Sequence, residues 1–77
     1  MYLTMVEINK LVGKRIKINP LLGRCKAMVY EHGDMFDVVN ISWYHAGVDG
    51  PDLKLVSGCG ATNWVALDTE FKIVEIL

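Results

Sequence analysis

The sequence predicts a single small domain of mainly β structure, and three observations favour this class. Apolar and polar residues alternate in short runs, as where Ile16 and Ile18 lie among basic residues, and a period of two is typical of a half-buried strand. Breakers such as Asn19-Pro20 and Gly50-Pro51 separate these runs at short intervals. The chain has 77 residues, which corresponds to one domain over residues 1–77.

A short helix is expected at about residues 4–12, ahead of the β region. Thr4 and Glu7 fit a capping box, in which the side chain of each accepts a hydrogen bond from the backbone N–H of the other. Gly13 then provides a stop, since glycine readily adopts the left-handed conformation found after helix C-termini. A strand over residues 2–8 is the alternative, because this segment also contains β-branched residues.

The stretch from Arg24 to Tyr44 is interpreted as a central β-hairpin with its turn around Gly33. A three-residue loop is preferred, because a loop with an odd number of residues joins the apolar faces of the two strands, whereas a slip of one residue would separate them. The other strands are expected at 14–19, 53–56, 64–67 and 71–77.

The two faces of this predicted hairpin differ in what must cover them. Side chains alternate along a strand, so one face is expected to build the core with Cys25, Ala27, Val29, Val39, Ile41 and Trp43. The other face is also apolar near the turn, where a half-buried strand normally exposes polar residues. It carries Met28, Tyr30, Phe36 and Val38. Either the chain's own helix or a strand covers this second face, or another molecule does.

The spacing of the strands resembles that of the SH3-like small barrels over roughly residues 13–77. The matching features are a strand ending at Lys17-Ile18, then Gly23-Arg24, a hairpin ending at Ile41-Ser42-Trp43, and Trp64-Val65 before a closing strand at 71–76. The resemblance implies a five-stranded barrel over about 14–77, with the short helix before it. This superfold hosts many functions and assigns none. The short chain also looks like the small accessory proteins that bacteriophages encode.

The residue types that carry catalysis or bind metals do not form a recognisable motif. The four candidate zinc ligands, Cys25, His32, His45 and Cys59, lack the close pairs of ligands that zinc motifs contain. Cys59 could act as a nucleophile only if the fold brought a histidine to it. We therefore expect no enzymatic activity, no catalytic residues, no metal and no cofactor. Neither a secretion signal nor a membrane span is evident, which predicts a cytoplasmic protein with free thiols and no contact with a membrane.

The function expected from these patterns is that of a non-enzymatic protein-interaction module. The chain would bind a protein partner, or a second copy of itself, through the apolar outer face of the hairpin formed by Met28, Tyr30, Phe36 and Val38. Self-association through the last strand, residues 71–77, is a further possibility, because the chain ends there as an apolar edge that invites the addition of another strand.

Nucleic-acid binding is the alternative function. The net charge is −1, but six of the eight basic residues lie within residues 10–26, whereas eight of the nine acidic residues follow Tyr30. A barrel of this kind would contact phosphates weakly and with a steep salt dependence. The residues expected to do so are Lys14, Arg15, Lys17, Arg24 and Lys26.

Overall fold

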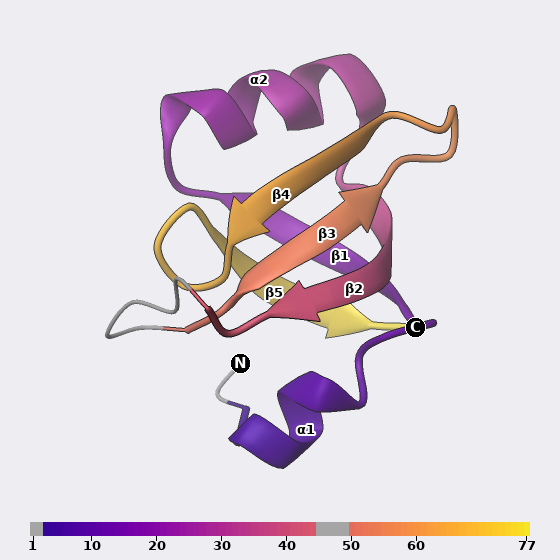
Figure 1. Ribbon diagram of the computed structural model, residues 1–77. Coiled ribbons are helices and arrows are strands. Elements are labelled where there is room, and N and C mark those ends of the chain that lie inside the picture. The colour runs from indigo at the N-terminus through magenta and orange to yellow at the C-terminus, as the bar shows by residue number, and fades with distance from the viewer. Residues whose placement is uncertain (1–2, 45–49) are drawn as a thin grey trace.

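The computed structural model of the chain describes residues 3–44 and 50–77, in which five strands form one antiparallel sheet (Figure 1). The strands are β1 (Arg15–Pro20), β2 (Met35–Ser42), β3 (Asp52–Val56), β4 (Thr62–Ala66) and β5 (Phe71–Ile76). Their order in the sheet is β4-β3-β2-β1-β5, so the last strand returns to lie beside the first. The prediction of a mainly β domain is confirmed.

The sheet is not closed into a barrel, which corrects the expectation of closure. β4 and β5 lie at the two ends of the strand order, and within the described residues only an isolated bridge between Leu67 and Phe71 links their ends. A second helix, α2 (Gly23–His32), packs against β1, lines a small cavity together with β4, and contributes two buried side chains, Cys25 and Met28, to the core. A helix therefore covers part of the interior that strand pairing would enclose in a barrel.

The first helix, α1 (Met5–Asn9), begins as the sequence predicts and ends early. The backbone N–H of Glu7 donates to Thr4 Oγ1 at 3.2 Å, and that of Thr4 donates to Glu7 Oε1 at 3.1 Å, which confirms the capping box. The chain then continues in turns rather than in helix up to residue 12. These turns place Leu11 beside Ile8 in the core.

The expected first strand of the central hairpin is wrong, because residues 23–32 form α2. Arg, Lys, Ala, Met and Glu in this segment are all favourable in helices. Cys25, Met28 and Val29 follow helical spacing, and they are buried or half-buried while Ala27 and Tyr30 are exposed. Leu22, at the N-cap position, makes no side-chain hydrogen bond, so the sequence carries no start signal for this helix.

The start of β2 buries the face that was expected to lie outside, because no strand precedes it in a hairpin. β2 pairs with β1 and β3 instead of with residues 24–30, and these neighbours place Phe36 opposite Ile16 and Val38 opposite Leu55. Phe36 and Val38 are 1% and 0% exposed. A register shift after Val38 then leaves Val39 exposed and returns Ile41 and Trp43 to partly buried positions against the core.

Buried side chains from both helices and every strand of the sheet form one continuous core. Figure 1 shows α2 above the bent sheet and α1 below it. Trp43 Nε1 donates to Asn9 Oδ1 at 2.8 Å, which ties α1 to the end of β2. The core consists of Ile8, Leu11, Ile16, Ile18, Cys25, Met28, Phe36, Val38, Leu53, Leu55, Val65, Leu67, Phe71 and Ile73. Neither described helix has the length and apolar character that a membrane span requires.

Candidate functional site

The four residues predicted to bind a partner do not form a surface. Met28, Phe36 and Val38 belong to the core, where α2 and the strands of the sheet cover them. Tyr30 is 92% exposed and projects from α2. The prediction of an apolar outer face is therefore corrected: the chain itself buries three of its members, because residue 28 lies on a helix and β2 turns Phe36 and Val38 inward.

The five basic residues proposed to contact nucleic acid are mostly engaged by acids. Arg15 Nε donates to Asp37 Oδ1 at 3.0 Å. Lys17 Nζ lies 3.9 Å from Asp34 Oδ2. Arg24 forms two hydrogen bonds with the carboxylate of Glu70, while Lys14 and Lys26 are exposed and form no ion pair within the described residues. Local carboxylates thus neutralise three of the five expected phosphate contacts.

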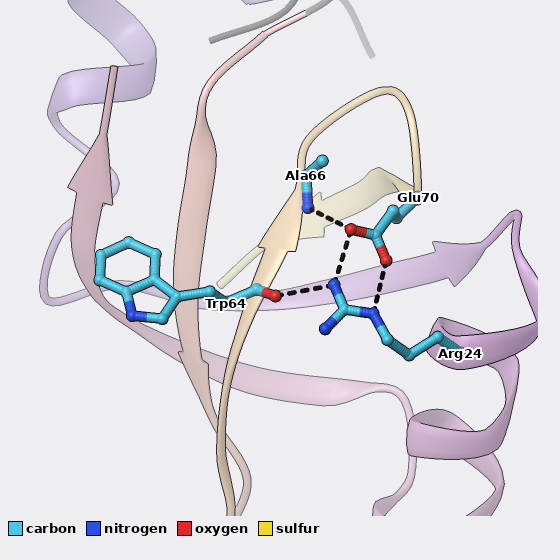
Figure 2. A network of polar contacts seen from close by, with 4 residues as sticks. All are labelled: Arg24, Trp64, Ala66 and Glu70. Atoms are coloured by element: carbon cyan, nitrogen blue, oxygen red, sulfur yellow. Dashed lines mark hydrogen bonds and ion pairs between the residues drawn. The ribbon is translucent and has the colours of Figure 1, made fainter. Parts of the chain in front are cut away.

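Arg24 and Glu70 close the outer edge of β4 (Figure 2). Arg24 Nε donates to Glu70 Oε2 at 2.9 Å, and Arg24 Nη2 donates to Glu70 Oε1 at 2.7 Å and to the carbonyl oxygen of Trp64 at 2.9 Å. Glu70 Oε1 also accepts from the backbone N–H of Ala66 at 3.3 Å, and the backbone N–H of Glu70 donates to the Ala66 carbonyl oxygen at 2.9 Å. The hydrogen bonds donated by Arg24 are the main reason that the pKa of Glu70 is lowered.

These contacts occupy the positions at the C-terminal end of β4 at which another strand would pair. Trp64 and Ala66 lie two residues apart, so their outer backbone groups point to the same side, away from β3. Side chains and the turn before β5 satisfy the Trp64 carbonyl group and both polar backbone groups of Ala66. Natural proteins protect exposed sheet edges in this way against pairing with other chains.

The outer edge of β5 is open among the residues that the structure describes. β1 is its only neighbour in the sheet, and across the described residues no hydrogen bond from outside that pairing reaches the backbone between Lys72 and Ile76. The side chains of this edge are also partly apolar: Val74 is 52% exposed and Ile76 is 36% exposed. Within the described residues the two ends of the sheet are therefore unequal, with the β4 edge capped at its C-terminal end and the β5 edge open.

A cysteine and a histidine also meet, which no local sequence signal predicts. Cys59 Sγ lies 3.2 Å from His32 Nδ1 and 3.1 Å from Ser57 Oγ. The two partners are 27 residues apart, and only the packing of α2 beside the turn between β3 and β4 brings them together. Of the other residues weighed as zinc ligands, Cys25 is buried in the core and His45 lies outside the described residues. The described part of the chain contains no cluster of three or more His, Cys, Asp or Glu residues that could hold a metal ion.

Comparison with known proteins does not assign this site. No protein-family model matches the sequence, and no curated protein and no solved structure matches the chain.

Proposed function

We propose that this chain is a non-enzymatic protein-interaction module that binds an extended segment along the outer edge of β5. The difference between the two sheet edges carries this proposal. The cap over Trp64 and Ala66 hinders pairing at β4, whereas the N–H and C=O groups of the open β5 edge are a template for an added strand. The bound segment belongs to a protein partner or to a second copy of the chain.

Backbone and side chains have different parts in this proposal. The N–H and C=O groups of β5 supply hydrogen bonds that any extended segment can accept and donate, and these provide affinity. Val74 and Ile76 supply exposed apolar contacts beside the strand, and these select a segment with apolar residues at alternate positions. Tyr30, the exposed member of the surface first expected, has no part in this contact.

The strand order supports the SH3-like resemblance at the level of arrangement, since β1 to β4 follow one another across the sheet and β5 lies beside β1. We place the protein in the cytoplasm, where its two free cysteines would remain reduced. An adaptor that offers a single sheet edge suits the kind of small accessory protein that bacteriophages encode.

Site-specific photo-crosslinking tests the β5 edge. A photoreactive amino acid is placed at Val74, and in a control protein at Val39, which is similarly exposed at 44% but lies on β2. The expected result is a covalent adduct from position 74 and little or none from position 39. An adduct of twice the chain mass in purified protein identifies a second copy, and a larger adduct formed only in host cells identifies a different partner. Equal adducts at both positions, or none at position 74 in either setting, would contradict the proposal.

Nucleic-acid binding remains the alternative. It is less well supported, because carboxylates already engage Arg15, Lys17 and Arg24. Binding would depend on exposed lysines such as Lys14 and Lys26, and a few such contacts give weak affinity at physiological salt.

A further inference from the structure

We propose that Cys59 is a modification site, a nucleophilic thiol paired with His32 that exchanges with disulfides of small amino-acid-derived thiols. The inference concerns a different part of the molecule from the β5 edge and does not depend on the proposed interaction. It rests on three observations: the position of the thiol, its polar partners, and a cavity beside it.

The backbone places the thiol at the tip of a tight turn. The N–H of Ser57 donates to the carbonyl oxygen of Ala61 at 2.9 Å, and the N–H of Gly60 donates to the carbonyl oxygen of Ser57 at 2.9 Å. Gly60 has φ +91°, a conformation that other residues rarely adopt, so glycine allows the chain to turn directly after Cys59. The thiol is exposed as a result, and reagents in solution can reach it.

The end of α2 places the histidine. Gly33 follows the helix with φ 85°, and its N–H donates to the Val29 carbonyl oxygen at 2.8 Å, so His32 is the last helical residue. The ring presents Nδ1 to Cys59, and Nε2 lies 3.6 Å from Glu31 Oε2. The contact with Glu31 is longer than a hydrogen bond, so Cys59 is the ring's closer partner, and a neutral imidazole nitrogen at 3.2 Å can take up the thiol proton.

The surroundings favour the thiolate, which is the reactive form of cysteine. Hydrogen bonds from the Ser57 hydroxyl, from the backbone N–H of Ala61 and from His32 lower the pKa of Cys59. Cys25 provides the contrast within the same chain. Cys25 lies on α2 with its thiol buried in the core, and this burial raises the pKa of the thiol. Only Cys59 is therefore both exposed and activated.

A cavity of about 170 Å³ is lined by His32 and by the neighbour of Cys59 in the turn, so a group attached to the thiol lies close to its opening. Gly58, next to Cys59 in the turn, forms part of its wall, and no heavy atom lies within 4 Å of the position that a Cβ on Gly58 would take. The wall also contains a guanidinium and a carboxylate, those of Arg15 and Asp37. These two groups pair with each other, so a small polar thiol such as cysteine or glutathione would contact them as an ion pair and exchange hydrogen bonds with it. The lining residues are Arg15, His32, Met35, Asp37, Val56 and Gly58.

The exchange reaction is balanced without any further reagent. His32 takes the thiol proton, and Cys59 Sγ attacks one sulfur of the disulfide RS–SR. A bond forms between Cys59 Sγ and that sulfur, the original S–S bond breaks, and RS⁻ leaves and accepts the proton from the imidazolium. Cys59 is oxidised to a mixed disulfide while half of the reagent is reduced to RSH. A free thiol reverses the modification by the same route.

The test measures the rate and the site of modification in the purified full-length chain. Oxidised glutathione is the disulfide, and intact mass with peptide mapping follows the product. We expect one glutathionyl group per chain, on Cys59, while Cys25 stays unmodified. The rate at pH 7 should exceed that of the urea-unfolded chain by about fivefold or more, because only a few per cent of an ordinary thiol is ionised at that pH.

Two variants test whether His32 activates the Cys59 thiol or whether the thiol reacts only because it is exposed. His32→Gln is expected to lower the rate by about fivefold, while Lys26→Gln, an exposed substitution on the same helix, should leave it unchanged. The pH–rate profile of the unaltered protein is a second measurement, and its midpoint should lie below that of a free cysteine. A rate no higher than in the unfolded chain, no effect of His32→Gln, or a midpoint equal to that of free cysteine would overturn the proposal.

Discussion

Arg24 joins three parts of the molecule through one side chain. It starts on the first turn of α2, binds the carboxylate of Glu70 in the turn before β5, and donates to the Trp64 carbonyl oxygen on β4. From sequence this arginine was counted among candidate phosphate contacts. The structure instead gives it a structural role, because its guanidinium is already matched by a bidentate carboxylate.

The Arg24–Glu70 pair predicts that part of the stability is sensitive to acid. The pKa of Glu70 is lowered in the folded state, so the pair contributes its full stabilisation above the pKa of an unfolded glutamate, about 4.3. That contribution is lost as the pH falls through the lower pKa of the folded state. Glu70→Gln should therefore destabilise the protein at pH 7 by about 1 kcal/mol, a modest value because Arg24 is largely exposed.

Urea unfolding at pH 7 and at a series of lower pH values measures this difference. The gap between the unaltered protein and Glu70→Gln should narrow on acidification below about pH 4. Glu75→Gln is the control, since Glu75 is an exposed acid without an ion pair in the described residues. A gap that stays constant with pH would contradict the assignment of the effect to Glu70.

At the scale of elements, α2 is the feature that sequence reasoning misplaced. The segment alternates well enough to read as a strand, and Leu22 supplies no N-cap signal. Gly33 was expected to form the turn of a hairpin, and it does turn the chain, but it does so at the end of a helix. The position of the turn at Gly33 was predicted correctly. Whether the preceding residues form a strand or a helix depended on which of their side chains pack into the core.

Two glycines at opposite ends of α2 provide a matched prediction. Gly33→Ala should destabilise the protein by about 1–2 kcal/mol, because Gly33 has φ 85° and ψ −177°, a region almost restricted to glycine. Gly23→Ala should be neutral or stabilising by up to about 1 kcal/mol, because Gly23 has no positive φ and a Cβ there meets no atom within 4 Å. Thermal or urea unfolding measures both, and similar effects at the two positions would argue against a helix that ends at His32.

At the scale of the whole molecule, the difference between the two sheet edges indicates more about the function than the net charge does. The charge of −1 gives no general attraction to polyanions, and most of the basic residues first assigned to phosphates face carboxylates. The open β5 edge, in contrast, has no neighbour across the described residues. Strand addition at β5 is therefore better supported than nucleic-acid binding.

A polyanion column tests whether nucleic-acid binding is the weaker of the two proposed functions. The protein should pass through immobilised heparin without retention at about 50 mM salt, because too few unpaired cations remain for strong phosphate contact. A protein of similar size with a strongly basic surface serves as the retained control. Retention of this chain that decreases steeply with salt, and that Lys14→Gln together with Lys26→Gln removes, would favour the nucleic-acid alternative instead.

Local interactions are what the sequence determined by itself. The capping box of Thr4 and Glu7, the β1 alternation around Ile16 and the late strands all follow from patterns a few residues long. The mainly β class follows from the sum of such patterns. These features could be predicted because their causes, hydrogen bonds between near neighbours and the period of a strand, lie within the segment concerned.

Tertiary structure alone decided which partner each apolar face meets. Whether Met28 and Phe36 would be surface or core depended on β2 pairing with β1 and β3, and on α2 covering one side of the sheet. The Arg24–Glu70 ion pair joins residues that are 46 positions apart, and the Cys59–His32 contact joins residues that are 27 positions apart. The free energy of burying the core selects one packing for the whole chain, and no short segment contains that information.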